Sequence, residues 1–178
     1  MEFRGTVKVY DPAVQALKSV GMLAVNLQCN PEQGLKGMTL DPNFDENGWM
    51  SLYYYHPVEA KACWWRIPRL SFLNGPAQQG SCCHTGGGMT WDQPGNLYLT
   101  VGNNRGNNIS AHTDERHGMI REVPQIRIHP EPDGSYTIPE GNMFSPGSQR
   151  PVLRFNTMGH RNAWRVTVDS ATGYLYWR

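Results

Sequence analysis

The chain lacks long apolar runs, and stretches with helical periodicity are nearly absent. A membrane-spanning helix needs about 20 consecutive apolar residues, so none is expected. The first residues, from Met1 to Gly5, contain no apolar segment, and no secretion signal is predicted in this chain. Only 17% of residues are charged and the net charge is +1, which gives no electrostatic reason to expect nucleic acid or an anionic membrane as a partner.

Cysteine is also scarce, and its spacing argues against a metal site. The four cysteines are Cys29, Cys63, Cys82 and Cys83, and no CxxC pair occurs. Free or buried thiols are the favoured interpretation. A disulfide between Cys82 and Cys83 is the alternative, although it requires a small ring and a strained backbone. A zinc site built from Cys82, Cys83 and His84 is disfavoured, because adjacent residues cannot easily direct three ligands to one tetrahedral ion. No metal ligands are therefore predicted.

Glycine and proline, by contrast, are plentiful, with 19 and 13 residues that fall mainly between short apolar runs. One template of this kind occurs three times, in residues 37–55, 88–99 and 164–177. Each copy has a short apolar strand, an aspartate, a turn ending in glycine and an aromatic-rich second strand, which is typical of a β-hairpin. The aspartates are expected to accept backbone N–H groups at the turns; they are Asp41, Asp92 and Asp169.

Hairpins that recur at intervals of tens of residues are too small to bury their own apolar faces, and they indicate a radial or stacked fold. A β-propeller is the favoured fold, because neighbouring blades bury those faces. The tryptophans at template positions are accordingly expected to pack between blades rather than to stack on sugar; they are Trp49, Trp91, Trp164 and Trp177.

Further strands are predicted between the copies of the template. Residues 5–10 are expected to pair with 20–27, and residues 125–129 with 136–138. Two more strands are expected in 62–72 and 152–155, while 74–80, 102–121 and 158–162 are predicted to be loops.

Four motifs, in this order, resemble those of the PQQ-dependent glucose/sorbosone dehydrogenases. They are GLKGMTLDPNF at 34–44 followed by Asn47-Gly48, CHTGGGM at 83–89 followed by DQPGNLY at 92–98, EPDGSYTIPEGN at 131–142, and GHRN at 159–162. Each motif alone is weak, but the ordered set is specific and covers nearly the whole chain. The resemblance implies a six-bladed β-propeller that binds pyrroloquinoline quinone (PQQ) and calcium.

The resemblance also implies an activity and a set of site residues. The activity is oxidation of an aldose or similar sugar hydroxyl by hydride transfer to the quinone. His84 matches the catalytic base, a role that suits imidazole because its pKa lies near neutrality. Arg161 and Asn162 match the cofactor-binding pair. Asn103 stands where the family has an aspartate that orients the histidine; an amide can bond imidazole but cannot stabilise its charged form.

The family's calcium ligands lie beyond the third copy of the template, and this chain ends at Arg178. Residues 1–178 are therefore predicted to form a partial propeller domain of about three blades that is inactive alone. A non-catalytic fragment that binds carbohydrate or protein is the alternative. The resemblance further implies a periplasmic or extracellular location and a cytochrome c electron acceptor. Because an incomplete ring leaves edges and apolar faces in water, the chain is also expected to be marginally stable and either to self-associate or to aggregate.

Overall fold

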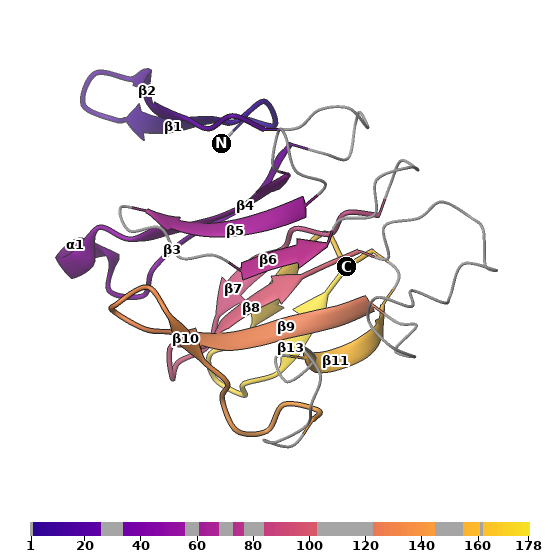
Figure 1. Cartoon of the computed structure of the whole chain (residues 1–178). Helices are drawn as coiled ribbons and strands as arrows, with labels where there is room; N and C mark the ends of the chain where they lie inside the picture. The colour runs from indigo at the N-terminus through magenta and orange to yellow at the C-terminus, as the bar shows by residue number, and fades with distance from the viewer. Residues whose placement is uncertain are drawn as a thin grey trace.

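The computed structural model describes residues 2–25, 34–55, 61–67, 73–76, 84–102, 123–144, 155–160 and 162–178. For 61–67, 73–76, 123–124, 155 and 158–159 it describes the backbone alone. Within these ranges the chain is all-β apart from one short helix, α1 (Phe44–Asn47). Figure 1 shows the sheets following one another along the chain as an arc that does not close. The prediction of an incomplete all-β propeller is confirmed.

The first sheet is a hairpin of β1 (Thr6–Asp11) and β2 (Ala16–Met22). Its second strand begins earlier than the predicted 20–27, because the turn between the strands is very short. Asp11 pairs with Ala16, and the Asp11 carboxylate accepts the backbone N–H of Ala13 at 3.0 Å inside that turn. Gln15 completes the reversal with a positive φ of 50°.

The second sheet has four strands in the order in which they occur along the chain: β3 (Leu35–Leu40), β4 (Met50–Tyr55), β5 (Lys61–Ile67) and β6 (Leu73–Pro76). The predicted strand 62–72 is confirmed for residues 62–67, while 68–72 lie outside the described residues. The predicted loop 74–80 was wrong at its start, because residues 74–76 belong to β6. The helix α1 lies between β3 and β4 and ends at Gly48, whose left-handed conformation lets its N–H reach the Phe44 carbonyl at 2.7 Å.

The third sheet has β9 (Val123–Pro130) at its centre. On one side it pairs with β8 (Leu97–Thr100), which pairs with β7 (Met89–Trp91). Its other edge is shared by two strands, because β10 (Tyr136–Thr137) pairs near Pro130 and β11 (Phe155–His160) pairs with residues 123–126. Residues 158–160, predicted as loop, therefore belong to a strand.

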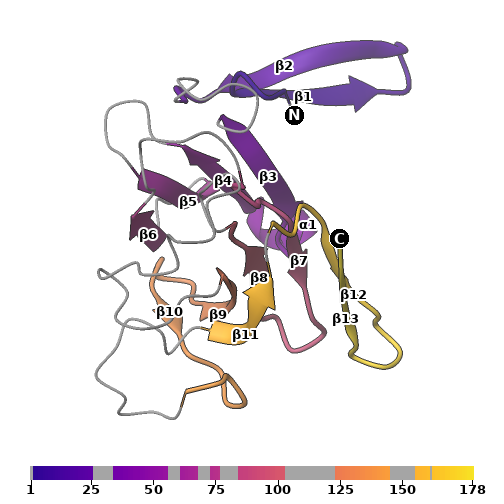
Figure 2. The ribbon, with the colours of Figure 1, turned by 90° about the vertical axis from the view of Figure 1, so that its right-hand side faces the viewer.

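The last sheet is the hairpin of β12 (Val166–Val168) and β13 (Leu175–Trp177). Strands β3 and β12 both lie against β7, so the first strands of three successive sheets share the inner side of the arc (Figure 2). The backbones approach closely here: a Cβ on Gly88 would lie 3.0 Å from the Cα of Arg165. This shared inner side is the arrangement expected of propeller blades.

The predicted role of the template aspartates is confirmed. Asp41 accepts the N–H of Asn43 at 3.0 Å, and Asp92 accepts that of Asn96 at 2.7 Å. Asp169 accepts the N–H of Ala171 at 2.9 Å. Each carboxylate thus holds the turn that joins the two strands of its hairpin.

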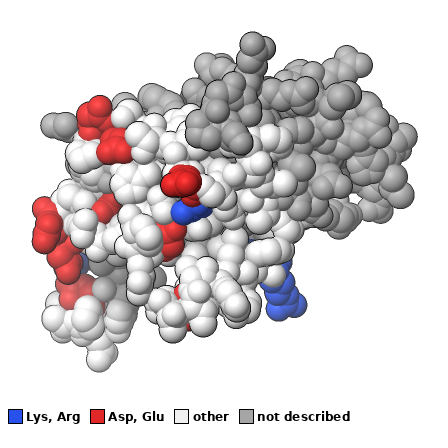
Figure 3. Space-filling model, turned by 90° about the horizontal axis from the view of Figure 1, so that it is seen from below, with Lys and Arg blue, Asp and Glu red and all other residues white. Residues whose placement is uncertain are grey.

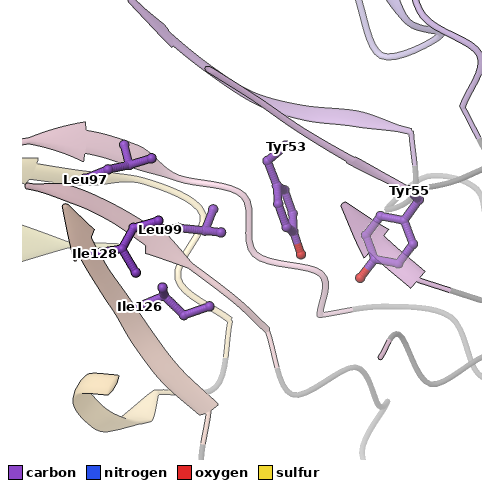
Figure 4. Packing of buried hydrophobic residues seen from close by; sticks show 6 residues of the cluster. All are labelled: Tyr53, Tyr55, Leu97, Leu99, Ile126 and Ile128. Carbon is purple, nitrogen blue, oxygen red and sulfur yellow. The ribbon is translucent and has the colours of Figure 1, made fainter. Parts of the chain in front are cut away.

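Strand β4 is buried on both faces, which explains its continuous apolar and aromatic sequence. One face, with Leu52 and Tyr54, packs on Val7 and Leu35. The other face packs on β8 and β9, as Figure 4 shows; this core contains Tyr53, Tyr55, Leu97, Leu99, Ile126 and Ile128.

The tryptophans follow the packing prediction only in part. Trp91 packs against the core between the second and third sheets. Trp164 and Trp177, however, are 40% and 43% exposed. They lie before β12 and at the end of β13, on the last hairpin of the arc, where no further sheet covers them within the described residues.

Candidate functional site

The loop of residues 84–88, which leads into β7, forms the centre of the candidate site. His84 is only 7% exposed, and its φ of 64° is unusual for a residue other than glycine. Residues 34 and 162–165 lead into β3 and β12 in the same way. Because these inner strands lie side by side, the segments that precede them meet at the same end of the strands.

The loop is held by hydrogen bonds from two neighbouring strands. Gly87 N–H donates to the Thr100 carbonyl at 2.9 Å, and Gly88 N–H donates to the Thr100 hydroxyl oxygen at 2.7 Å. From the second sheet, the Tyr53 hydroxyl donates to the Thr85 carbonyl at 3.1 Å. Both partners are buried, so these bonds fix the backbone that carries His84.

Asn162 ties the same loop to the segment before β12. Its Oδ1 accepts the N–H of Gly86 at 2.9 Å. Since a backbone N–H can only donate, the side-chain atom that it meets must be the oxygen. The Nδ2 group of Asn162 therefore points elsewhere and is the part of this side chain that can serve a ligand.

Gly102 completes the packing around His84. A Cβ at this position would lie 1.8 Å from the His84 carbonyl oxygen and 2.8 Å from Asn162 Oδ1. Only a glycine fits there without displacing the backbone. Three segments far apart in the sequence thus converge on the 84–88 loop.

Beside this loop is a shallow hollow of about 200 Å³ with cationic and aromatic walls. The Lys36 ammonium lies 4.5 Å from the centre of the Trp164 ring and 5.7 Å from that of Phe3. The remaining walls come from Leu35, Gly86 and Arg165. A second hollow of about 370 Å³ continues along Asn162, Trp164, Arg165 and Arg178.

The structure brings together two of the four predicted site residues. Asn162 accepts a hydrogen bond from Gly86 in the loop that begins with His84, and Gly102 packs against both His84 and Asn162. Asn103 and Arg161 lie outside the described residues. In the sequence, Asn103 directly follows Gly102 and Arg161 directly precedes Asn162. The sequence argument missed the support given by Tyr53 and Thr100, because no motif distinguishes them from other strand residues.

The sequence argument also missed the hollow. A signal was available at Lys36, a cation within the otherwise apolar segment GLKGM at 34–38. His160, another candidate by type, has a packing role: its Nε2 lies 2.8 Å from the Thr157 hydroxyl, and its ring meets Trp177 edge-on at 4.6 Å.

The chemistry of the hollow suits a planar, anionic ligand. Lys36, Arg165 and Arg178 can pair with carboxylates, and the Trp164 ring offers a flat surface. PQQ, a planar quinone that bears carboxylates, fits this donor set. A metal ion is not matched in the same way, since the described residues contain no cluster of three His, Cys, Asp or Glu side chains.

Comparisons with known proteins agree with this architecture. A family model described as "Glucose / Sorbosone dehydrogenase" matches residues 1–178. A search among curated proteins found no match. No helix in the described ranges is long and apolar enough to cross a membrane.

Several solved structures have the same fold. A putative oxidoreductase (glucose dehydrogenase) from Thermus thermophilus has a TM-score of 0.76 at 22% identity, over 99% of this chain and 52% of that one. A soluble aldose sugar dehydrogenase from Escherichia coli has a TM-score of 0.68 at 17% identity, over 99% and 52% of the two chains. The PQQ-bound aldose sugar dehydrogenase from Streptomyces coelicolor has a TM-score of 0.60 at 18% identity, over 98% and 50%. The chain therefore spans about half the length of these structures.

Proposed function

Because the chain belongs to the glucose/sorbosone dehydrogenase family, we propose that it supplies part of the active site of a PQQ-dependent sugar dehydrogenase. The observation that carries the proposal is the convergence of the His84 loop, Asn162 and the cationic hollow at one end of the inner strands. The reaction proposed is oxidation of an aldose or similar sugar hydroxyl.

In this proposal His84 is the base. Its imidazole accepts the proton of the sugar hydroxyl, and the burial of its loop keeps water from competing for that proton. When bound, the quinone would supply the acceptor for the hydride that leaves the carbon bearing this hydroxyl. The bonds from Tyr53, Thr100 and Asn162 hold the loop so that the imidazole does not have to be ordered during the reaction.

The cofactor would be held by the residues around the hollow. Lys36 and Arg165, with Arg161 as predicted from the sequence, would pair with its carboxylates, and Asn162 would donate through Nδ2. Trp164 would lie against its plane. Asn103 would orient His84, with a weaker effect than the aspartate of the family pattern.

Calcium, the electron acceptor and the location remain parts of the proposal that come from the family resemblance. The described residues do not fit calcium, so its ligands would lie elsewhere, and no step is assigned to it. A cytochrome c would accept the electrons, in a periplasmic or extracellular setting. On its own, the chain is proposed to bind the quinone weakly and not to oxidise sugar.

A chimera tests the catalytic part of the proposal. Residues 1–178 would be joined to the C-terminal half of the Streptomyces coelicolor enzyme, loaded with PQQ and calcium, and assayed for aldose-dependent dye reduction. Activity that falls at least ~100-fold in His84→Asn would support His84 as the base. Asparagine is the suitable replacement because it tolerates a positive φ.

The outcomes of this assay separate the candidate functions. Quinone binding without aldose-dependent reduction would favour the alternative, a non-catalytic propeller piece that binds carbohydrate or protein. Equal activity in the chimera and in His84→Asn would remove His84 from the mechanism. An Asn103→Asp chimera should be faster, and an unchanged rate would show that Asn103 and His84 are not coupled.

A further inference from the structure

The third sheet has two unlike faces. Leu99 on β8 and Ile126 on β9 lie opposite each other and belong to the core shared with the second sheet (Figure 4). Because successive side chains of a strand point to opposite faces, the neighbouring Thr100 and Gln125 point the other way. A Cβ on Gly88 would lie 3.0 Å both from Thr100 Oγ1 and from the backbone of Arg165. The second face is therefore turned toward the segment that leads into β12.

A row of three polar side chains crosses this second face. Gln125 on β9 lies between its two register partners, Thr100 on β8 and Thr157 on β11. Gln125 and Thr100 are both 0% exposed. Since a glutamine side chain is longer than that of threonine, the amide of Gln125 extends beyond the two hydroxyl groups that flank it. The threonines therefore do not fill the space on either side of this amide.

The amide of Gln125 is buried, yet neither its oxygen nor its nitrogen meets a hydrogen-bond partner among the described residues. Folded proteins rarely leave such groups unpaired, because the desolvated group then loses its hydrogen bonds to water without replacement. A group that is long, buried and polar at both atoms thus requires a small polar partner.

The hydroxyl of Thr100 offers a further hydrogen bond beside this amide. Its oxygen accepts the N–H of Gly88 at 2.7 Å. The same oxygen lies 3.3 Å from the Gly88 carbonyl oxygen, which is longer than the usual 2.5–3.0 Å of an O–H···O bond. The proton of this hydroxyl can therefore be donated elsewhere.

We propose that a buried water molecule binds between the amide of Gln125 and the hydroxyl of Thr100. The water would donate to Gln125 Oε1 and accept from Gln125 Nε2 and from the Thr100 hydroxyl. These are about three hydrogen bonds, the usual number for a buried water. The arrangement satisfies every polar atom that the protein itself leaves unpaired in this row.

A neutral ligand suits this position better than an ion. The row of Thr100, Gln125 and Thr157 contains no charged side chain. Arg127, two residues further along β9, has its Nε 3.8 Å from the carboxylate of Asp92, so its charge is balanced nearby. The described part of the face in Figure 3 is also mostly uncharged. There is thus little field to draw an ion inward.

The water would connect β9 with the loop that carries His84. Thr100 already holds that loop, because its carbonyl accepts the N–H of Gly87 at 2.9 Å and its hydroxyl oxygen accepts that of Gly88. By fixing the rotation of the Thr100 hydroxyl, the water would fix the lone pair that Gly88 uses. The inference rests on burial and hydrogen bonding and does not depend on the proposed catalytic activity.

NMR spectroscopy of the 178-residue chain tests the proposal. The side-chain amide protons of Gln125 should show cross-peaks to a long-lived water. Magnetic relaxation dispersion counts such waters, and Gln125→Met should lower the count by about one, because methionine has a similar length but no amide. The exchange of the Gly88 amide should also become faster in this variant. Gln93→Met is the matched control: it makes the same change at an exposed side chain, so both readouts should be unchanged.

Substitutions at Thr100 test the second partner of the water. Thr100→Val removes the hydroxyl and should also lower the count, whereas Thr100→Ser keeps the hydroxyl and should retain the water. The proposal is overturned by an absent cross-peak at Gln125, by an unchanged count in Gln125→Met or Thr100→Val, or by an equal loss in Gln93→Met. Should the variants fail to fold, the cross-peak in the unaltered chain decides alone.

Discussion

Asn162 Oδ1 accepts the backbone N–H of Gly86 at 2.9 Å and so joins two segments 76 residues apart in sequence. The bond connects the entry to β12 with the loop that carries His84. Because the amide oxygen is used in this way, Asn162 has a structural task besides any contact with a ligand. The two roles can be separated by substitution.

Asn162→Ala should lower the free energy of unfolding by about 1–3 kcal/mol, since it leaves the partly buried Gly86 N–H without its acceptor. Hydrogen exchange at Gly86 should become faster. Asn162→Asp is the control, because it keeps an oxygen at the same position and should retain most of the stability. Equal losses in the two variants would mean that the bond to Gly86 contributes little.

Gly102→Ala should destabilise the chain by about 2–3 kcal/mol, as expected for overpacking a tightly packed position. The added Cβ would lie 1.8 Å from the His84 carbonyl oxygen, so the backbone must move. Gly21→Ala is the matched control, because nothing lies within 4 Å of its Cβ. Thermal unfolding of both variants measures the difference, and similar melting temperatures would contradict the packing described here.

Lys36→Met should weaken binding of PQQ to the chain by about 5- to 10-fold, because a cation next to an aromatic ring is lost from the hollow. Lys18→Met changes the net charge equally but lies on the exposed strand β2, so its affinity should match that of the unaltered chain. Absorbance titration of the quinone gives both constants. If both variants bind equally well, the cofactor does not use this hollow.

Asp169 should titrate below its ordinary pKa of 3.8, because the backbone N–H of Ala171 and then the hydroxyl of Thr172 stabilise its ionised form. A lowered pKa means that the turn is stabilised above pH 3.8 and loses this contribution as the pH falls through the lower value. Thr172→Val should raise the pKa of Asp169 toward the ordinary value. Carboxyl NMR titration measures it, and an unchanged pKa would exclude a role for that hydroxyl.

The hairpins were predictable because their determinants are local. Each template copy has its aspartate and its turn glycine within a few residues, and the structure uses both in the predicted way. Strand limits were less predictable. β11 takes up residues 158–160 because β9 offers it a free edge, and that edge is defined by residues some 30 positions earlier in the chain.

The site was predictable only through resemblance. The sequence indicated His84 and Asn162 by their motifs, but the bond from Asn162 to Gly86 depends on how three sheets approach each other. The same holds for Lys36, whose contact with Trp164 joins the starts of two distant strands. The sequence prediction overestimated the burial of Trp164. The template gives the position of this residue in the hairpin, but it does not show whether another sheet packs over that hairpin.

The short turns of the template also bear on the order of folding. In each hairpin the aspartate and the N–H that it binds are separated by only two to four residues, so closing these loops costs little chain entropy. The bond between Asn162 and Gly86 spans a much longer loop and needs the sheets to be in place. The hairpins should therefore form early and the His84 loop late, which makes exchange of the Gly86 amide a kinetic marker for the final step of folding.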